Sequence, residues 1–271
     1  MANRETTKRS KAKEQRECMK IVFLGSGNVA THLAQALDAL GHEILQVYSR
    51  TLGNARILAD KVGAAPTDRI EELSHEAHLY IFSLKDDALA GVINAMPHTR
   101  GIWVHTAGSI SIDLFAPRAK SYGVLYPLQT FSRDREVHFK QVPFFIEGSD
   151  DEITRVLEEL ALSLSENVHR LDSERRAVIH LAAVFACNFT NHMYTLAEEI
   201  IVEQKIPFEV LKPLILETAR KVMEMSPRDA QTGPAVRYDE KVMQAHLDRI
   251  SSPSTRELYS LLSKSIHSRS R

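Results

Sequence analysis

The sequence predicts an α/β fold in which a doubly wound sheet at the N-terminal end is followed by an all-α C-terminal part. Three observations support this prediction. Short apolar runs alternate with helical segments up to about residue 170, the first run ends in a glycine-rich turn, and the pattern from Asp172 onward is almost entirely helical. Alternation of strands and helices is typical of a parallel sheet covered on both faces.

The first strand is predicted at residues 20–25, where the run KIVFLG ends in glycine. A helix follows, because Val29, Leu33 and Leu37 recur at helical spacing and Gly41 is the residue type that ends helices. A second helix over residues 52–62 ends at Gly63. Further strands are predicted at residues 42–49, 79–84, 101–106, 122–126 and 142–148.

The C-terminal half shows helix boundaries and few strand signals. Ser149 and Glu152 form a predicted capping box for a helix that ends near Ser165. Residues 173–204 contain neither glycine nor proline, which predicts one helix of about 30 residues, roughly 45 Å long. Later boundaries are predicted at Pro207 (start of the next helix), Pro227 (its end) and Ser254 with Glu257 (cap of the last helix).

These patterns divide the chain into a tail (1–18), a sheet domain (19–170) and a helical domain (171–271). The tail is rich in Lys and Arg, and we interpret it as solvated chain; a basic arm for an anionic partner is the alternative. A net charge of −1 excludes a nucleic-acid footprint over the whole chain, and no apolar run is long enough for a membrane span. Two cysteines exclude a disulfide framework, so we expect a cytoplasmic protein.

The glycine-rich turn carries the first chemical prediction. It follows a strand, opens a helix and lies inside a β-α-β unit, which is the setting of the Rossmann dinucleotide motif. Gly25 allows the turn, Gly27 lets the backbone approach a pyrophosphate, and Ala30 is small enough for close helix packing. The alternative is a turn that serves packing alone. The predicted cofactor-binding residues here are Gly25, Ser26, Gly27, Asn28, Val29 and Ala30.

The end of the second strand decides which dinucleotide is expected. An NAD site places an acidic residue there, but this chain has Ser49, Arg50 and Thr51. An arginine pairs with a 2′-phosphate, and the two hydroxyl groups are further donors. The sequence therefore predicts NADP as the cofactor. The alternative is a surface arginine without a role.

Two later strand ends point to the nicotinamide side of the site. Ligands of open α/β sheets lie outside the carboxyl ends of the strands, which places Ser83, Leu84 and His105 near the cofactor. His105 is a candidate proton donor, because imidazole titrates near neutral pH. The alternative for His105 is a strand-end histidine that hydrogen-bonds to backbone. Asp86 and Asp87 are interpreted as a helix start.

The long helix carries polar residues within an apolar run. Spacings of four place His180, Asn188 and His192 on one face, with Asn191 beside it. Substrate binding or proton delivery in a cleft explains these residues, and hydrogen bonding across a helix or dimer interface is the alternative. Farther along, Arg237 and Asp239 either anchor a substrate carboxylate or pair with each other. No histidine pattern indicates a metal site.

Together these segments resemble a known family. The strings MKIVFLGSGNVATHLAQAL, YSRT, SLKDDAL, VHTAGS, LYPLQTFS and TGPAVRYD are similar to Rossmann-like NADP oxidoreductases with an uncharacterised helical C-terminal domain. That family is related to pyrroline-5-carboxylate reductases and deazaflavin-dependent NADP reductases, and its C-terminal domain to that of 6-phosphogluconate dehydrogenases. The resemblance covers residues 19–268 and implies an NADP-binding fold with a helical dimerisation domain.

The resemblance does not extend to a particular substrate. The carboxylate-binding loop of the pyrroline-5-carboxylate reductases is replaced here by QTGPAVRYDEKV (231–242), and the long helix has no lysine before Lys205. We therefore expect an oxidoreductase that transfers a hydride between NADPH and a small carbonyl or imine compound, with His105, Asn188 and His180 as catalytic residues. A non-catalytic NADP-binding sensor or scaffold is the alternative. The apolar long helix predicts a homodimer through the helical domain.

Overall fold

The computed structural model describes residues 18–270 of the chain. The chain divides into two compact units, Met1–Phe185 and Ala186–Arg271. This division falls later than the predicted boundary near residue 170, so the domain limits 19–170 and 171–271 stay a prediction. The predicted tail, apart from Cys18, lies outside the described residues.

The first unit begins with the predicted β-α-β pattern. Strand β1 (Lys20–Leu24) leads into helix α2 (Asn28–Ala39), and β2 (Glu43–Tyr48) leads into α3 (Leu52–Val62). Gly63 ends α3 in the left-handed conformation at φ 64°, as predicted from its place after the last apolar residue. A short strand β3 (Ala65–Thr67) and a 3₁₀ turn η1 (Ile70–Glu72) follow.

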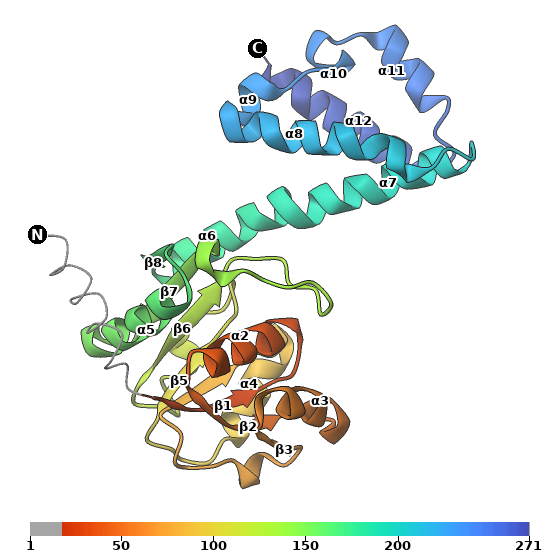
Figure 1. The fold of residues 1–271 in the computed structure, drawn as a ribbon. Coiled ribbons are helices and arrows are strands. Elements are labelled where there is room, and N and C mark those ends of the chain that lie inside the picture. The colour runs from red at the N-terminus through yellow and green to blue at the C-terminus, as the bar shows by residue number, and fades with distance from the viewer. Residues whose placement is uncertain (1–17, 271) are drawn as a thin grey trace, which may run out of the picture. The chain divides into compact units, whose positions relative to one another are not determined.

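The sheet continues with three more parallel strands (Figure 1). They are β4 (Leu79–Phe82), β5 (Ile102–His105) and β6 (Tyr122–Pro127), with α4 (Asp86–Ala95) between the first two. Asp86 and Asp87 occupy the first turn of α4, which confirms the predicted helix start. A 3₁₀ turn η2 (Ile112–Leu114) precedes β6.

The last two strands run against the others. Strand β7 (Phe144–Gly148) pairs antiparallel with β6, and β8 (Val168–Arg170) pairs parallel with β7. A 3₁₀ turn η3 (Phe139–Gln141) precedes β7, and α5 (Asp151–Leu164) joins the two strands. The predicted Ser149 cap of α5 is wrong by one residue, because the Asp150 carboxylate accepts the hydrogen bond from the Ile153 N–H at 2.9 Å. The sheet order is β3-β2-β1-β4-β5-β6-β7-β8.

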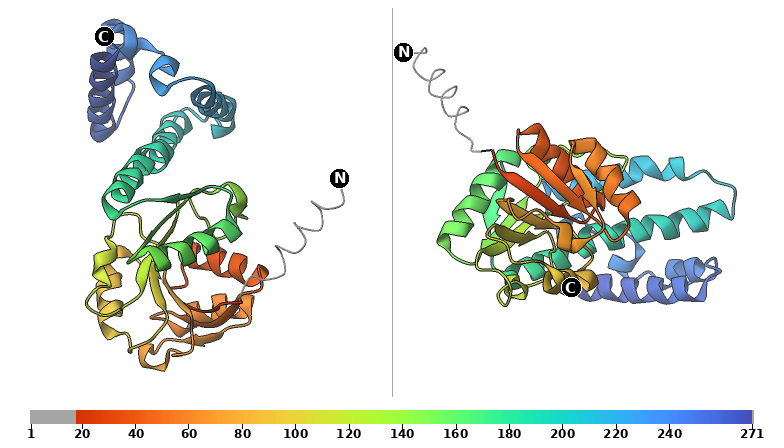
Figure 2. Two further views of the ribbon diagram at one scale, coloured as in Figure 1. Left: turned by 90° about the vertical axis from the view of Figure 1, so that its left-hand side faces the viewer. Right: turned by 90° about the horizontal axis from the view of Figure 1, so that it is seen from below.

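Helices cover both faces of this sheet, and Figure 2 shows the first unit from two further sides. Successive residues of each strand contribute to opposite cores. In β1, Ile21 and Phe23 pack with α2, α3 and α5, whereas Val22 and Leu24 pack with α4. Farther along the second face, Tyr126 of β6 packs near the helix that follows β8. The fold class is therefore the predicted one, a mostly parallel doubly wound sheet followed by helices.

The predicted long helix is helical throughout but is not one α-helix. Helix α6 (Ser173–Ala183) passes into a π-helical segment, η4 (Val184–Phe189), and then into α7 (Thr190–Val202). The division between the two compact units lies inside the π-helical segment. π-Helical turns occur frequently at functional sites.

The second unit is helical, as predicted. After α7 come η5 (Phe208–Leu211), α8 (Lys212–Glu224), α9 (Pro227–Ala230), α10 (Pro234–Arg237), α11 (Glu240–Leu247) and α12 (Pro253–Arg269).

Three of the predicted boundaries in this unit are wrong by a few residues. Pro207 precedes a 3₁₀ turn, and Pro227 begins α9 because proline fits the first turn of a helix. The cap of α12 is Ser252, whose hydroxyl accepts from Thr255 N–H. Both serines near this start are suitable caps, so the sequence alone does not select between them.

Candidate functional site

The carboxyl ends of β1, β2, β4 and β5 meet at one edge of the sheet. The Gly25 N–H donates to the Tyr48 carbonyl at 2.8 Å, which joins the ends of β1 and β2. The Ser83 N–H donates to the Leu24 carbonyl at 2.8 Å, and the Thr106 N–H donates to the Phe82 carbonyl at 3.2 Å. The predicted binding segments after these four strands are therefore neighbours in space.

The glycine-rich turn is shaped for close backbone approach. Gly25 has φ 117°, and a Cβ there would lie 2.1 Å from the Ser83 carbonyl oxygen, so only glycine fits. A Cβ at Gly27 would meet no atom within 4 Å among the described residues, so the exposed turn has free space in front of it. Ala30 is fully buried against the sheet.

The start of α2 fits an anionic group. Gly27 is the N-cap, and within the described part of the chain no side chain caps this helix and no acidic residue lies in its first turn. The free N–H groups and the helix dipole thus face the open turn, as a pyrophosphate requires. Ser26 is half-buried within the turn.

Asn28 and His32 of α2 hold a loop that follows β6. The Asn28 amide donates to the Phe131 carbonyl at 2.9 Å, and His32 Nε2 lies 2.9 Å from the Ser132 carbonyl oxygen. The segment LYPLQTFS thus reaches from the end of β6 to the first turns of α2. The side chain of Asn28 binds this loop. The predicted contact of Asn28 with the cofactor would therefore be made by its backbone.

The end of β2 fits a second anionic group. Ser49 is half-buried, whereas Arg50 and Thr51 are exposed. Thr51 is the N-cap of α3, and of the described residues none caps this helix with a side chain or adds an acid to its first turn. A guanidinium and two hydroxyl groups beside an uncapped helix start suit the 2′-phosphate of NADP.

The ends of β4 and β5 continue the site toward α6. The Thr106 hydroxyl donates to the Ser83 hydroxyl at 3.2 Å, and Leu84 lies beside Gly25. Gly108 is buried, and a Cβ on it would lie 2.6 Å from Nδ1 of His180. The backbone after β5 therefore packs directly against the His180 ring, which the sequence predicted as a site residue.

His105 occupies a different environment. Its side chain is fully buried, and Nδ1 accepts from the Ala107 N–H at 3.2 Å. Burial, and then the positive charge of Arg176, lower the pKa of His105 to about 3. The ring is therefore neutral at physiological pH, and its hydrogen bond is to backbone, the second of the two roles considered for it.

The sequence reasoning missed Tyr126. Its hydroxyl lies 3.0 Å from His180 Nδ1, with the two rings edge to face and their centroids 6.0 Å apart. Tyr126 is in the apolar run predicted as a strand over residues 122–126, and no role was assigned to its hydroxyl. Its position near the carboxyl end of β6, the edge where ligands bind, is the available signal, and Tyr48 at the end of β2 shares it.

An ion pair lies behind this pair of rings. Arg176 of α6 is fully buried and donates to the Glu147 carboxylate and to the Ile110 carbonyl. The Ser173 hydroxyl donates to the same carboxylate at 2.7 Å. These contacts hold the start of α6 on the sheet, one to two helical turns before His180.

The remaining predicted polar residues lie in the second unit. Asn188 is exposed within the π-helical segment, and Asn191 and His192 are exposed in α7. The role predicted for Asn188 and His192 stays a prediction. Asp239 caps α11 by accepting from Val242 N–H, and across the described residues it forms no ion pair with Arg237.

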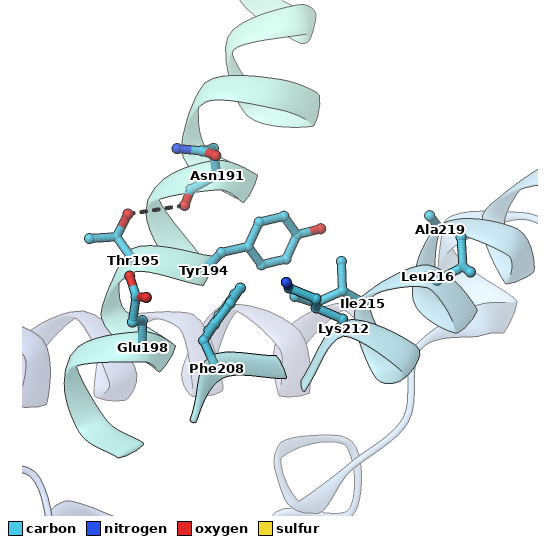
Figure 3. A pocket seen from close by; sticks show the side chains of 9 residues that line it. All are labelled: Asn191, Tyr194, Thr195, Glu198, Phe208, Lys212, Ile215, Leu216 and Ala219. Carbon is cyan, nitrogen blue, oxygen red and sulfur yellow. Dashed lines mark hydrogen bonds between the residues drawn. The ribbon is translucent and has the colours of Figure 1, made fainter. Parts of the chain in front are cut away.

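The second unit also contains an open cavity of about 460 Å³. Figure 3 shows the side chains of Tyr194, Phe208 and Lys212 pointing toward the same space between α7 and α8. Lys212 Nζ is paired with Glu209 at 3.0 Å, and the remaining wall is mainly apolar. An open apolar surface of this kind is typical of a contact region.

Residues 18–270 contain neither a membrane-spanning helix nor a cluster of metal-ligating side chains. No helix in this part of the chain is both long and apolar enough to cross a membrane. In the same residues, His, Cys, Asp and Glu side chains form no group of three or more that suits a metal ion.

Comparisons with protein families match both parts of the chain. Residues 20–114 match the family described as NADP oxidoreductase, coenzyme F420-dependent. Residues 142–266 match a domain of unknown function, DUF2520. A comparison with curated proteins gives no significant match.

Solved structures resemble the chain over nearly its whole length. A protein described as a "putative NADP oxidoreductase" from Bacteroides fragilis is 50% identical, with a TM-score of 0.87, and the match covers 93% of this chain and 99% of that one. A 1-pyrroline-5-carboxylate reductase from Streptococcus pyogenes is 16% identical, with a TM-score of 0.65 and coverage of 93% and 100%. A reductive aminase from Aspergillus terreus, in complex with NADPH and ethyl-5-oxohexanoate, is 18% identical, with a TM-score of 0.68 and coverage of 93% and 94%. The last two likenesses show the fold alone.

Proposed function

Because the chain belongs to the family of NADP oxidoreductases that includes the Bacteroides fragilis protein, we propose that it transfers a hydride between NADPH and a small carbonyl or imine compound. The observation that carries this proposal is a run of contacts along the strand ends, from the Gly25 turn to Ser83, from Ser83 to Thr106, and from Gly108 to His180. The fold of the reductive aminase, whose complex holds NADPH and a keto ester, supports the choice of a carbonyl or imine.

The residues present fit the cofactor. The start of α2 at Gly27 would hold the pyrophosphate, and Ser49, Arg50 and Thr51 would hold the 2′-phosphate. Bound there, NADPH supplies a hydride to an acceptor. The chain's own contribution is to orient the two reactants, exclude water and supply a proton.

We assign the proton supply to His180 instead of His105. His180 is half-buried at the edge where the strands end, whereas His105 is fully buried and neutral. An imidazole that reaches solvent regains its proton after each turnover, which a buried one cannot do. His105 instead holds the backbone after β5 in place through Ala107.

Binding of NADPH and NADH tests the cofactor assignment. Removing the guanidinium in Arg50→Ala should cost about 1.5–3 kcal/mol of NADPH binding, the range for a charged hydrogen bond, and leave NADH binding unchanged. Arg56→Ala is the matched control, because Arg56 is exposed on α3, the helix that follows Arg50, and we assign it no role. Equal affinities of the wild type for NADPH and NADH would contradict the assignment.

Turnover tests the hydride transfer. NADPH oxidation is followed with a panel of small ketones and aldehydes, each with and without a primary amine to form imines. We expect at least one of them to be reduced by the wild type, and His180→Ala to lower kcat while NADPH affinity is kept. If NADPH binds and every compound is left unchanged, the chain is a sensor or scaffold and the proposal fails.

We also propose a homodimer that forms through the helical unit. Of the described residues of this unit, only Ala235, Ile250 and Ser263 are buried, so it has little core of its own. Large apolar side chains are exposed instead, with Leu214 at 64%. A second copy covers such a surface most simply by two-fold symmetry. The exposed set is Phe189, Ile200, Val202, Ile206, Val210, Leu214, Leu216, Val222, Met223, Met225, Tyr238, Val242, Leu261 and Leu262.

Light scattering at micromolar concentration measures this association. We expect a dimer for the wild type and a shift to monomer for Leu214→Glu, because a charge in a buried contact is strongly unfavourable. Leu162→Glu is the matched control, since Leu162 is similarly exposed but lies on α5 of the first unit. A monomeric wild type would contradict the proposal.

A further inference from the structure

Tyr126 lies near the edge of the sheet where the substrate would need a proton. Packing of its ring does not by itself explain why the residue carries a hydroxyl. Its side chain is 9% exposed, and its hydroxyl is directed to His180 Nδ1 at 3.0 Å. The neighbouring strand β5 ends opposite Val124, two residues before Tyr126, and the backbone of Gly108 also packs against the His180 ring. The phenol and the imidazole therefore form one hydrogen-bonded unit at the ligand edge of the sheet.

Helix α6 brings two charged or titratable groups to Tyr126: His180 through its hydrogen bond and Arg176 through its charge. Arg176 in turn pairs with Glu147 of β7, and its charge also acts on His105 of β5. Burial raises the pKa of the Tyr126 phenol, and the positive charge of Arg176 acts in the opposite direction. Arg176 Nε has no hydrogen-bond partner among the described residues, although the side chain is fully buried. The Arg176 guanidinium, paired with Glu147, lies within electrostatic range of the phenol.

We propose that Tyr126 is the catalytic acid that donates a proton directly to the substrate, that His180 returns a proton to it, and that Arg176 is a positioning residue for the pair. This inference rests on the proposed function and adds to it the residue that contacts the reacting atom. It requires the tautomer of His180 in which Nδ1 carries hydrogen and donates to Tyr126 Oη. The hydroxyl hydrogen of Tyr126 is then available to the substrate.

The step balances as follows. When the carbon of the substrate C=O or C=N bond gains a hydride, the π electrons of that bond move to the oxygen or nitrogen. That atom forms a bond to the hydroxyl proton of Tyr126, and the O–H electron pair stays on Oη. His180 Nδ1–H then transfers its proton to the phenolate while His180 Nε2 takes up a proton from solvent, so the ring stays neutral. Exchange with water returns the ring to the starting tautomer, which its half-buried position permits.

A titration that needs no substrate tests this assignment. The ring of NADP⁺ is positively charged and that of NADPH is neutral, while both carry the same phosphates. A phenol next to that ring becomes easier to ionise with NADP⁺ than with NADPH, by a factor of about ten or more for a charge within about 4–6 Å. The probe is ultraviolet absorbance of tyrosinate against pH, for the full chain saturated with either form.

Two variants identify the tyrosine that responds. The chain has seven tyrosines, so the response of Tyr126 is the part that is absent in Tyr126→Phe. Tyr122→Phe is the matched control, because Tyr122 lies at the opposite end of the same strand and should leave the response in place. Difluorotyrosine at position 126 lowers the pH at which the phenol ionises and keeps the measurement within the folded range.

The outcomes separate this inference from the proposed function. If neither form of the cofactor binds the wild type, the proposed function fails and the inference fails with it. If both forms bind and Tyr126 ionises equally with each, or the response persists in Tyr126→Phe, the inference is overturned and the cofactor assignment stands. A response that is lost in Tyr126→Phe and kept in Tyr122→Phe supports it.

Arg176 needs a readout of its own, since the assignment gives it a positioning role. Arg176→Lys keeps the positive charge, and Arg176→Gln removes it. We expect the cofactor-dependent response of Tyr126 to be present in Arg176→Lys and to move to higher pH in Arg176→Gln. Identical titrations in these two variants would overturn the role of Arg176.

Discussion

The buried ion pair between Arg176 and Glu147 allows a quantitative prediction about stability. The Arg176 side chain is fully buried and that of Glu147 is 17% exposed. Replacement of Arg176 by methionine keeps a similar length but leaves the carboxylate buried without its partner. Removing one member of a buried pair costs about 3–5 kcal/mol. We expect Arg176→Met to destabilise the first unit by about that amount.

The adjacent residue provides the matched control. Arg175 pairs with Asp172 at 3.5 Å, but its side chain is 75% exposed. An exposed ion pair contributes about 0–1 kcal/mol, so Arg175→Met should have little effect on the free energy of unfolding. The double variant Arg176→Met/Glu147→Gln removes both charges and should regain about 1–3 kcal/mol of the loss.

Urea denaturation measures these differences. Trp103 is the only tryptophan in the sequence and is buried in the first unit, so its fluorescence reports the unfolding of that unit. The reasoning is refuted if Arg176→Met loses no more stability than Arg175→Met. It is also refuted if the double variant loses as much stability as Arg176→Met and Glu147→Gln lose together, because the cost of Arg176→Met would then not come from an unpaired charge.

Two further predictions concern the strand ends. Gly25→Ala places a Cβ 2.1 Å from the Ser83 carbonyl oxygen and should abolish NADPH binding in calorimetry; normal binding would contradict this. Gly63→Ala is the control, because a Cβ at Gly63 meets free space. It should bind NADPH normally and lose only about 1–2 kcal/mol of stability, because the backbone at this position is left-handed. The second concerns His105, whose pKa is lowered to about 3 in the folded chain from an ordinary value of 6.5. Between these pH values the unfolded state binds more protons, so this contribution to stability is complete above about pH 6.5 and falls as the pH is lowered, by up to about 1.4 kcal/mol per pH unit. His105→Asn keeps an acceptor for the Ala107 N–H and should make the acid side of the stability profile flatter; an unchanged profile in urea denaturation would contradict it.

Much of the fold follows from the sequence because its signals are local. The strand β1, the glycine-rich turn and α2 each depend on residues close together in the chain, and Gly63 ends α3 for a reason visible at that residue. The predicted positions of two helix caps differ from the observed ones by one or two residues. Asp150 and Ser252 serve where Ser149 and Ser254 were predicted, since neighbouring polar residues compete for the same N–H group.

Strand direction and side-chain partners were harder to predict. The run VPFFIEG shows that a strand is buried, but its pattern reads the same in both directions, so the reversal of β7 was not predicted. Tyr126 belongs to an apolar strand, and its contact with His180 joins residues 54 positions apart. For the same reason His105 was expected as a proton donor, because the burial that lowers its pKa depends on distant segments.

The reversal of β7 has a consequence for how the chain delivers a side chain to its ligand edge. Helices α2, α3 and α4 each leave that edge and run back toward the start of the next strand, so only their first turns face a ligand. Since β7 and β8 run the other way, the helix that follows β8 sets out from the far edge and travels toward the strand ends. His180, two turns along α6, is thereby brought to Gly108 and Tyr126. Because of this one change of strand direction, the interior of a helix reaches the site instead of a helix start. A side chain there is held by neighbouring turns on both sides.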